Sequence, residues 1–224
     1  MAMLVDRAEY LSAGVHIGMK SCTKSMKKFV YKIRDDGLAV LNLQMVDERI
    51  KTAAAFLSRF GKVMVVARKA NAALPMSKFS ESTGCKYVAG RFSPGTLTNP
   101  SYRDFYEPEV LLVVDPLVDE QAMKEAVNKR IPIIALCDTF NEVKNVDFIV
   151  PVNNNGRKSL ALIFWLFTKE ILKSKKKKFD MTVEDFGGGG EDMETDAIVE
   201  EEQKAETHGK KATPGKGKYR KAEK

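Results

Sequence analysis

The chain has 224 residues and a formal net charge of +7, and 44% of its residues are apolar. That length fits one domain of ordinary size with extensions, and the apolar fraction is enough for a sizeable core. Its three cysteines, Cys22, Cys85 and Cys137, are an odd number and lie far apart without a Cys-x-x-Cys pair, which excludes a disulfide framework and a zinc site of the usual spacing.

Neither a secretion signal nor a membrane span is evident. The first residues include Asp6 and Glu9 where a signal peptide would have a basic and then an apolar run. The longest apolar run, residues 160–167, is far shorter than the roughly 20 residues that cross a bilayer. A cytoplasmic protein without membrane contact is therefore expected.

Charge is distributed unevenly. Residues 180–206 hold eleven acids against one lysine, and residues 208–224 hold seven Lys or Arg against one Glu. Removing these leaves 29 basic and 18 acidic residues in 1–179, a net charge of +11. Such a surplus favours an anionic partner, and the alternative is a charge that only maintains solubility.

The chain begins with a predicted helix over residues 7–13, with Asp6 as its N-cap and Gly14 at its end. His16 follows between two aliphatic residues. A lone histidine in such a setting, with no partner at catalytic or metal spacing, is interpreted as structural.

The basic segment over residues 20–34 contains no acid, and Phe29 and Tyr31 lie among its cations. A segment of this kind can neutralise phosphates and stack on bases. The alternative is a solvated strand in which Phe29, Tyr31 and Ile33 alternate inward, leading into a turn at residues 35–37. We favour the first interpretation and expect RNA contacts from Lys20, Lys24, Lys27, Lys28, Lys32 and Arg34.

From residue 38 onward, predicted strands alternate with predicted helices. The expected strands are 38–43, 62–67, 87–89, 110–114, 131–136 and 148–150. The expected helices are 45–60, 71–83, 118–129 and 156–173, with Asp119 as an N-cap. Nearly continuous Val, Ile and Leu runs indicate strands buried on both faces. We predict an α/β fold: a flavodoxin-like, doubly wound, mostly parallel sheet of about five strands with helices on both faces.

Three segments are expected along the chain. Residues 1–36 form an N-terminal helix and a basic extended segment, and residues 37–173 form the α/β domain. Residues 174–224 form a charged tail, predicted to be disordered from Asp180 because its composition buries too little apolar surface. The four lysines over 175–178 either contact phosphate or solubilise the end of the last helix.

Ligands of doubly wound sheets bind at the carboxyl ends of the strands. These ends carry Arg68, Lys69, Asp115, Asp138 and three asparagines over 153–155. The two aspartates are a candidate metal pocket, but each lies where a loop begins and where Asp favours turn and cap hydrogen bonds, which is the favoured interpretation. Lys69 is expected to contact phosphate.

A long loop separates the strands predicted at 87–89 and 110–114. Loops of this length inside a compact domain are uncommon and usually functional. Its cations, hydroxyls and amides suit a polyanion with sugars and bases, whereas the alternative is a surface loop whose aromatics cover the sheet edge. The expected RNA contacts in this loop are Arg91, Thr96, Thr98 and Asn99.

Residues 153–157, with the sequence NNNGR, open the last helix. Its backbone N–H groups together with Arg157 and Lys158 are suited to an anion, and asparagine capping is equally compatible. Phosphate-loop and dinucleotide-binding motifs are absent from the sequence, and no Ser or Cys has an evident His and Asp partner set. Neither catalysis, nor a cofactor, metal or small-molecule substrate, is expected.

Several motifs occur together in one order, and they resemble the universal family of the second protein of the small ribosomal subunit, in its archaeal and eukaryotic form. The resemblance covers about residues 10–172. Its motifs are LSAGVHIG at 11–18, GRFSPGTLTNP at 90–100, PEVLLV at 108–113, ALCDT at 135–139 and PVNNNGRKS at 151–159.

The resemblance implies a flavodoxin-like fold without the coiled-coil hairpin of bacterial members. It also implies a structural, non-catalytic component near the junction of head and body, which binds small-subunit ribosomal RNA and neighbouring ribosomal proteins. Two other classes stay open: a nucleotide-binding enzyme that uses the strand ends, and a protein adaptor anchored by the loop aromatics. A copurifying nucleotide would favour the enzyme, and loss of association on mutating the loop aromatics alone would favour the adaptor.

Overall fold

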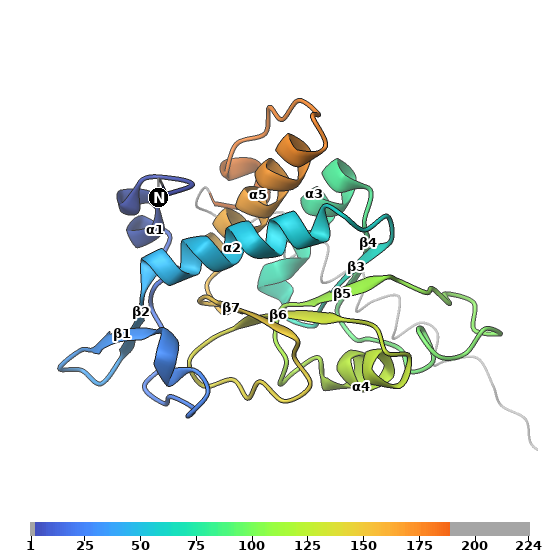
Figure 1. Cartoon of the computed structure of the whole chain (residues 1–224), viewed down its shortest axis with the longest axis horizontal. Helices are drawn as coiled ribbons and strands as arrows, with labels where there is room; N and C mark the ends of the chain where they lie inside the picture. Colours follow the sequence, from blue (N-terminus) through green and yellow to red (C-terminus); the bar gives the residue numbers. More distant parts are fainter. Residues whose placement is uncertain (1–2, 189–224) are drawn as a thin grey trace, which may run out of the picture. The chain divides into compact units, whose positions relative to one another are not determined.

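Five parallel strands form the central sheet of the computed structural model, which describes residues 3–188 (Figure 1). Their order across the sheet is β4-β3-β5-β6-β7. This is the flavodoxin-like doubly wound order, in which the direction of winding across the sheet reverses between β3 and β5. The strands are β3 (Val63–Ala67), β4 (Lys86–Ala89), β5 (Val110–Val113), β6 (Ile133–Cys137) and β7 (Phe148–Pro151).

Helices cover both faces of this sheet, because the strands are apolar on both sides. Every residue of β3, β5 and β6 is buried. Figure 1 shows α2 (Leu43–Leu57), α3 (Ala73–Thr83) and α5 (Arg157–Ser174) on one face and α4 (Glu120–Asn128) on the other. On the three-helix face, α5 packs between α2 and α3. The predicted α/β architecture is confirmed.

The strand predicted at 38–43 lies outside this sheet, which corrects the sequence interpretation. β2 (Ala39–Leu41) pairs antiparallel with β1 (Val30–Ile33) in a two-stranded hairpin. The turn predicted at 35–37 is confirmed, with Gly37 at a φ of 84°. The strand is also shorter than predicted, because α2 begins two residues earlier than its apolar period indicates. The Asn42 side chain caps this helix by accepting from the Gln44 N–H at 3.0 Å.

The N-terminal segment contributes to the main core. Tyr10, Val15, Met26 and Phe29 are each at most 1% exposed. The short helix α1 (Arg7–Ser12) is held through Tyr10, whose hydroxyl donates to the Asp47 carboxylate of α2 at 2.9 Å. Asp6 occupies the expected N-cap position, but its side chain makes no capping hydrogen bond.

The chain beyond α5 is ordered further than predicted. Within residues 179–188 the Trp165 indole N–H donates to the Met181 carbonyl at 2.8 Å, and Phe186, in the short 3-10 helix η3 (Glu184–Phe186), is fully buried. The prediction of disorder from Asp180 is wrong here because a few well-spaced apolar residues anchor the segment despite the polar average. The rest of the predicted tail lies outside the described residues.

Candidate ribonucleoprotein site

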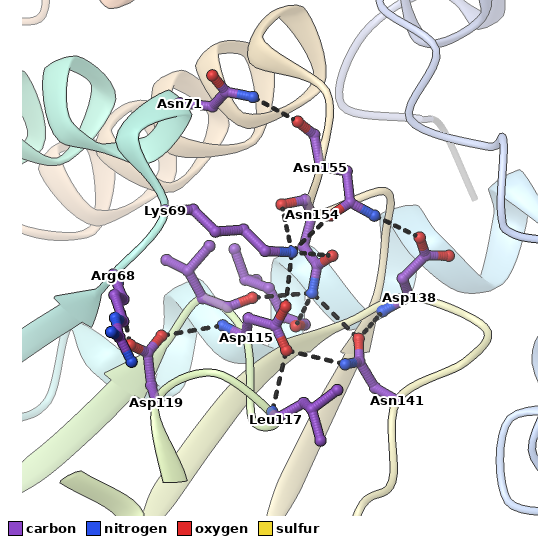
Figure 2. Close-up of polar contacts among 12 residues, drawn as sticks. Arg68, Lys69, Asn71, Asp115, Leu117, Asp119, Asp138, Asn141, Asn154 and Asn155 are labelled. Atoms are coloured by element: carbon purple, nitrogen blue, oxygen red, sulfur yellow. Dashed lines mark hydrogen bonds and ion pairs between the residues drawn. The ribbon is translucent and has the colours of Figure 1, made fainter. Parts of the chain in front are cut away.

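The ends of the two central strands carry an ion pair. Lys69 follows β3 and Asp115 follows β5, and the Lys69 Nζ lies 2.6 Å from the Asp115 Oδ2 (Figure 2). The side chains are 19% and 1% exposed. Because β3 and β5 flank the point where the winding direction changes, the pair occupies the crevice in which doubly wound proteins bind ligands.

Asparagines complete this strand-end network. The same Lys69 ammonium donates to Oδ1 of Asn154 at 3.1 Å and of Asn155 at 2.6 Å. The buried Asn154 amide in turn donates to the carbonyls of Val114 and Leu136, at 3.0 and 3.1 Å. One carboxamide therefore joins the ends of β5 and β6, and the three donors of Lys69 are satisfied within the chain.

The two aspartates singled out from the sequence hold turns, as the favoured interpretation predicted. Asp115 Oδ1 accepts from the Leu117 N–H and from the Asn141 amide, both at 2.9 Å. Asp138 accepts from the Thr139 N–H at 2.6 Å and from Asn155 at 3.1 Å. Burial raises the pKa of Asp138, and these hydrogen bonds oppose the rise. Residues 3–188 contain no group of three or more His, Cys, Asp or Glu arranged to hold a metal ion.

Asp119 lies at the predicted N-cap of α4 but serves another strand. Its carboxylate accepts from the backbone N–H groups of Arg68, at 2.9 Å, and of Asp115, at 3.4 Å, and makes no capping bond to its own helix. Burial raises its pKa to about 6, against the effect of the two hydrogen bonds. Asp119 thus ties the ends of β3 and β5 together.

The long loop is held by a carboxylate of α4 for which the sequence predicted no role. Buried Glu125 of α4 accepts from the N–H groups of Gly95, at 2.7 Å, and Leu97, at 3.1 Å, and from the Thr98 hydroxyl at 3.2 Å. The Thr96 hydroxyl donates to the Ser93 carbonyl at 2.7 Å, and Thr96 is only 4% exposed. The polar groups of the loop therefore satisfy its own backbone.

Of the loop residues expected to contact RNA, Thr96 is consequently out of reach of a partner. Thr98 is half-buried, whereas Asn99 and Arg91 are exposed. The Asn99 side chain accepts from the Ser101 N–H at 3.0 Å, a local turn bond. The structure brings Arg91 and Asn99 to the surface and does not group them with the basic segment.

The basic segment passes through the short 3-10 helix η1 (Lys27–Phe29) and ends in the first strand and turn of an exposed hairpin. Its six cations, Lys20, Lys24, Lys27, Lys28, Lys32 and Arg34, are all exposed. The alternative in which its three apolar residues alternate inward is wrong, since Phe29 is 1% exposed while Tyr31 is 70% and Ile33 is 66% exposed. Figure 1 shows the β1–β2 hairpin projecting from the body of the protein.

Asparagine capping of α5 is not observed, because the N-cap residue is Gly156 and no side chain caps the helix. The asparagines instead form a turn just before α5. Asn153 Oδ1 accepts from the N–H groups of Asn155 and Gly156, at 3.0 and 3.2 Å. Arg157 is half-buried and Lys158 is exposed. Binding of an anion by Arg157 and Lys158 stays a prediction.

Sequence reasoning placed Asn154 at the strand ends, but it missed Asn141 and assigned no role to Glu125. Each is a polar residue in an apolar or turn-rich context whose burial is set by a distant partner. Asn141 follows the strand predicted at 131–136, and this position, together with the strand-end aspartates, was the available signal. The pattern of a helix gives no such signal for Glu125, because the loop that it binds precedes it by about 30 residues.

The structure thus defines a doubly wound α/β protein whose strand-end crevice is filled by its own side chains and which exposes six cations along residues 20–34. Within residues 3–188 no helix has the length and apolar character needed to traverse a bilayer.

Comparison with known proteins gives the family. The family model described as ribosomal protein S2 matches residues 10–104 and 102–174. A small ribosomal subunit protein uS2 of Staphylothermus marinus is 48% identical over 175 residues, 77% of this chain and 80% of the relative. That of Ignicoccus hospitalis is 51% identical over 173 residues, 76% of this chain and 82% of the relative. The chain belongs to the ribosomal protein S2 family, and is a non-catalytic structural protein of the small ribosomal subunit in the cytoplasm.

Proposed function

We propose that the chain binds small-subunit ribosomal RNA through the β1–β2 hairpin and the basic residues that lead into it, and that it contacts neighbouring ribosomal proteins near the junction of head and body. The observation that carries the RNA proposal is the exposure of six cations on one continuous segment without an acid between residues 20 and 34. The location near the head–body junction rests on the family resemblance.

The exposed Tyr31 suits this role. A 70% exposed aromatic ring between two lysine-bearing stretches is available to stack on an unpaired base. Lys28 and Arg49 lie over the buried Phe29 ring, at 5.0 and 5.4 Å from its centroid, and these contacts fix the base of the hairpin. A fixed base holds the lysines in place before RNA arrives.

Lys69 and Thr96 are expected to contribute little to RNA binding. The Lys69 charge is compensated by Asp115, and burial of Thr96 keeps it from RNA. Arg157 and Lys158 stay secondary candidates, on α5.

The test is the salt dependence of binding to small-subunit ribosomal RNA. In Lys27→Ala/Lys28→Ala the slope of log K against log salt should fall by about one unit for each phosphate that the variant no longer neutralises. The matched control is Lys124→Ala, which removes an exposed lysine that is paired with Glu120 on α4. An unchanged slope in the double variant would remove Lys27 and Lys28, which lead into the hairpin, from the interface.

Sedimentation tests assembly directly. The full chain should migrate with the small subunit in a gradient of cell lysate and should dissociate progressively in high salt. Migration only as a free protein would contradict the proposal for RNA and neighbouring proteins together.

Chemical footprinting of the ribosomal RNA tests the location. Compared with particles that lack the chain, particles that contain it should show protected nucleotides near the head–body junction, and protection elsewhere would correct the location.

A further inference from the structure

A small pocket lies at the carboxyl edge of the sheet, beside the strand-end network. Its volume is about 210 Å³, below the roughly 300–1,000 Å³ of sites for drug-sized ligands, so it suits one side chain of a macromolecular partner. Three segments meet there: the residue after β3, the start of the long loop and the start of α4. It is lined by Arg68, Arg91, Phe92, Pro94, Val118, Asp119 and Gln121.

The two arginines supply its charge. Both are exposed, and neither guanidinium forms an ion pair or a side-chain hydrogen bond with residues 3–188. The carboxylate in the lining, Asp119, is buried and accepts backbone hydrogen bonds from Arg68 and Asp115. Guanidinium groups pair in a bidentate manner with carboxylates and phosphates, so the pocket is suited to an anionic group.

Exposed aliphatic side chains follow β5 at the pocket. Val118 lines the pocket and is 38% exposed, and its chain neighbour Leu117 is 61% exposed, in the turn between β5 and α4. The turn is fixed, because the Leu117 N–H donates to the buried Asp115 carboxylate at 2.9 Å. An exposed aliphatic side chain beside two exposed guanidinium groups, with a second aliphatic side chain adjacent in the chain, is a surface that becomes more stable when an apolar partner covers it.

We propose that this pocket docks an acidic segment of a neighbouring protein. A carboxylate of that segment pairs with Arg68 and Arg91, and an adjacent apolar side chain covers Leu117 and Val118. The inference goes beyond RNA binding by the hairpin, and it assigns Arg91 to a protein contact in place of the phosphate contact expected from the sequence.

Chemistry favours a protein over RNA at this position. Aromatic rings are common stacking platforms for unpaired bases, and the aromatic residue of the lining, Phe92, is only 5% exposed. Aliphatic side chains beside arginines complement alternating acidic and apolar residues of a peptide.

The first experiment is a titration of the purified full chain, labelled for nuclear magnetic resonance, at physiological salt. The probes are a short peptide of alternating Asp and Leu, the same peptide with Lys for Asp, and oligouridine of equal length. The acidic peptide should shift the signals of Arg68, Arg91, Leu117, Val118 and Gln121, and the basic peptide should not. Tighter binding of oligouridine at these residues, scattered shifts, or no shift at the highest soluble peptide concentration would overturn the inference.

Variants make the titration specific. Arg68→Ala/Arg91→Ala should weaken binding of the acidic peptide roughly tenfold or more, since the variant cannot form two charge-assisted hydrogen-bond pairs. The control is Arg59→Ala, because Arg59 is exposed and lies just before β3 begins, at the amino edge of the sheet. Equal weakening in both variants would show attraction to net charge alone and would contradict the pocket.

The second experiment examines the assembled particle. A photoreactive amino acid is placed at Leu117 of the full chain. Its control is placed at Val127, which is 44% exposed and lies in α4, the helix that follows Leu117. From Leu117 a nuclease-resistant crosslink to a peptide containing Asp or Glu is expected, with loss of the crosslink in Arg68→Ala/Arg91→Ala. A nuclease-sensitive crosslink, or none, in particles that contain the chain would reject the protein partner. Absence of the chain from particles would instead contradict the proposed function, and the titration alone would then decide the inference.

Discussion

The ammonium of Lys69 lies 2.6 Å from the carboxylate of Asp115 at the reversal point of the sheet, where related architectures hold a ligand. In this chain the position is occupied by a buried ion pair and the amides of Asn154 and Asn155. The fold therefore retains the crevice in which related architectures bind ligands, but side chains of the chain itself occupy it. This arrangement suits a protein that binds its partners at its outer surface.

Removing one partner of this pair should be costly. Lys69→Met leaves the Asp115 carboxylate buried without its cation, and we expect the free energy of unfolding to fall by about 3–5 kcal/mol. Urea unfolding measures this change in the free energy of unfolding. Lys69→Met/Asp115→Asn should recover a substantial part of the loss because no charge stays buried. The exposed pair of Lys78 and Glu81 is the control, and Lys78→Ala should change stability by less than about 1 kcal/mol. A similar small effect for Lys69→Met would show that the network does not hold the strand ends.

Glu125 should control the long loop. In Glu125→Gln the new amide group presents hydrogens to the N–H groups of Gly95 or Leu97, so one donor loses its acceptor at a cost of about 1–3 kcal/mol. Hydrogen exchange at these two amides should accelerate. Glu120→Gln, at an exposed position of the same helix, should leave their exchange unchanged. Unaltered exchange in Glu125→Gln would mean that the loop is held by other interactions.

Asp119 should give the protein a pH-dependent stability. Its folded pKa is raised to about 6, whereas an aspartate in the unfolded chain titrates near 3.9. Between about pH 4 and 6 the folded protein keeps a proton that the unfolded chain has lost, so the free energy of unfolding contributed by this group falls as pH rises, by up to about 3 kcal/mol.

This pH dependence is measured as the difference between the wild-type protein and Asp119→Asn in urea unfolding from pH 4 to 7. The wild-type protein should lose stability relative to the variant as pH rises through this window. Asp138, whose pKa is also raised, is present in both proteins and cancels. A constant difference would show that Asp119 is ionised throughout.

Substitutions at Tyr31 and Phe29 should affect RNA binding and stability separately. Tyr31→Ser removes an exposed ring and should weaken RNA binding by about 1–3 kcal/mol, with less than about 0.5 kcal/mol change in the free energy of unfolding. Phe29→Ala removes a buried ring and should lower the free energy of unfolding by about 3–5 kcal/mol. RNA binding and urea unfolding are measured on both. Full RNA affinity in Tyr31→Ser would exclude stacking on this ring.

Phe186 should anchor the segment that follows α5. Phe186→Ala leaves a cavity in the core and should cost about 3–5 kcal/mol. Limited proteolysis should then cleave near Met181, whose carbonyl accepts from Trp165 in the intact protein. The exposed Glu184 of the same short helix is the control, and Glu184→Ala should be nearly neutral. Equal protease resistance in Phe186→Ala would place the anchor elsewhere.

The sequence alone determined the parallel sheet, its helices and the exposed basic segment. These depend on local patterns: runs of Val, Ile and Leu bury a strand on both faces, and a stretch of lysines without acids cannot enter a core. The position of Asp115 and Asp138 directly after apolar runs also identified them as turn residues.

Only the tertiary structure decided which polar groups meet. Glu125 binds the N–H of Leu97 across 28 residues of sequence, and Asn154 binds the Val114 carbonyl across 40. The burial of Phe186 likewise depends on α3 and α5 meeting above the sheet. Such contacts are set by the winding order of the strands, which brings distant residues to one sheet edge, and local periodicity contains no record of that order.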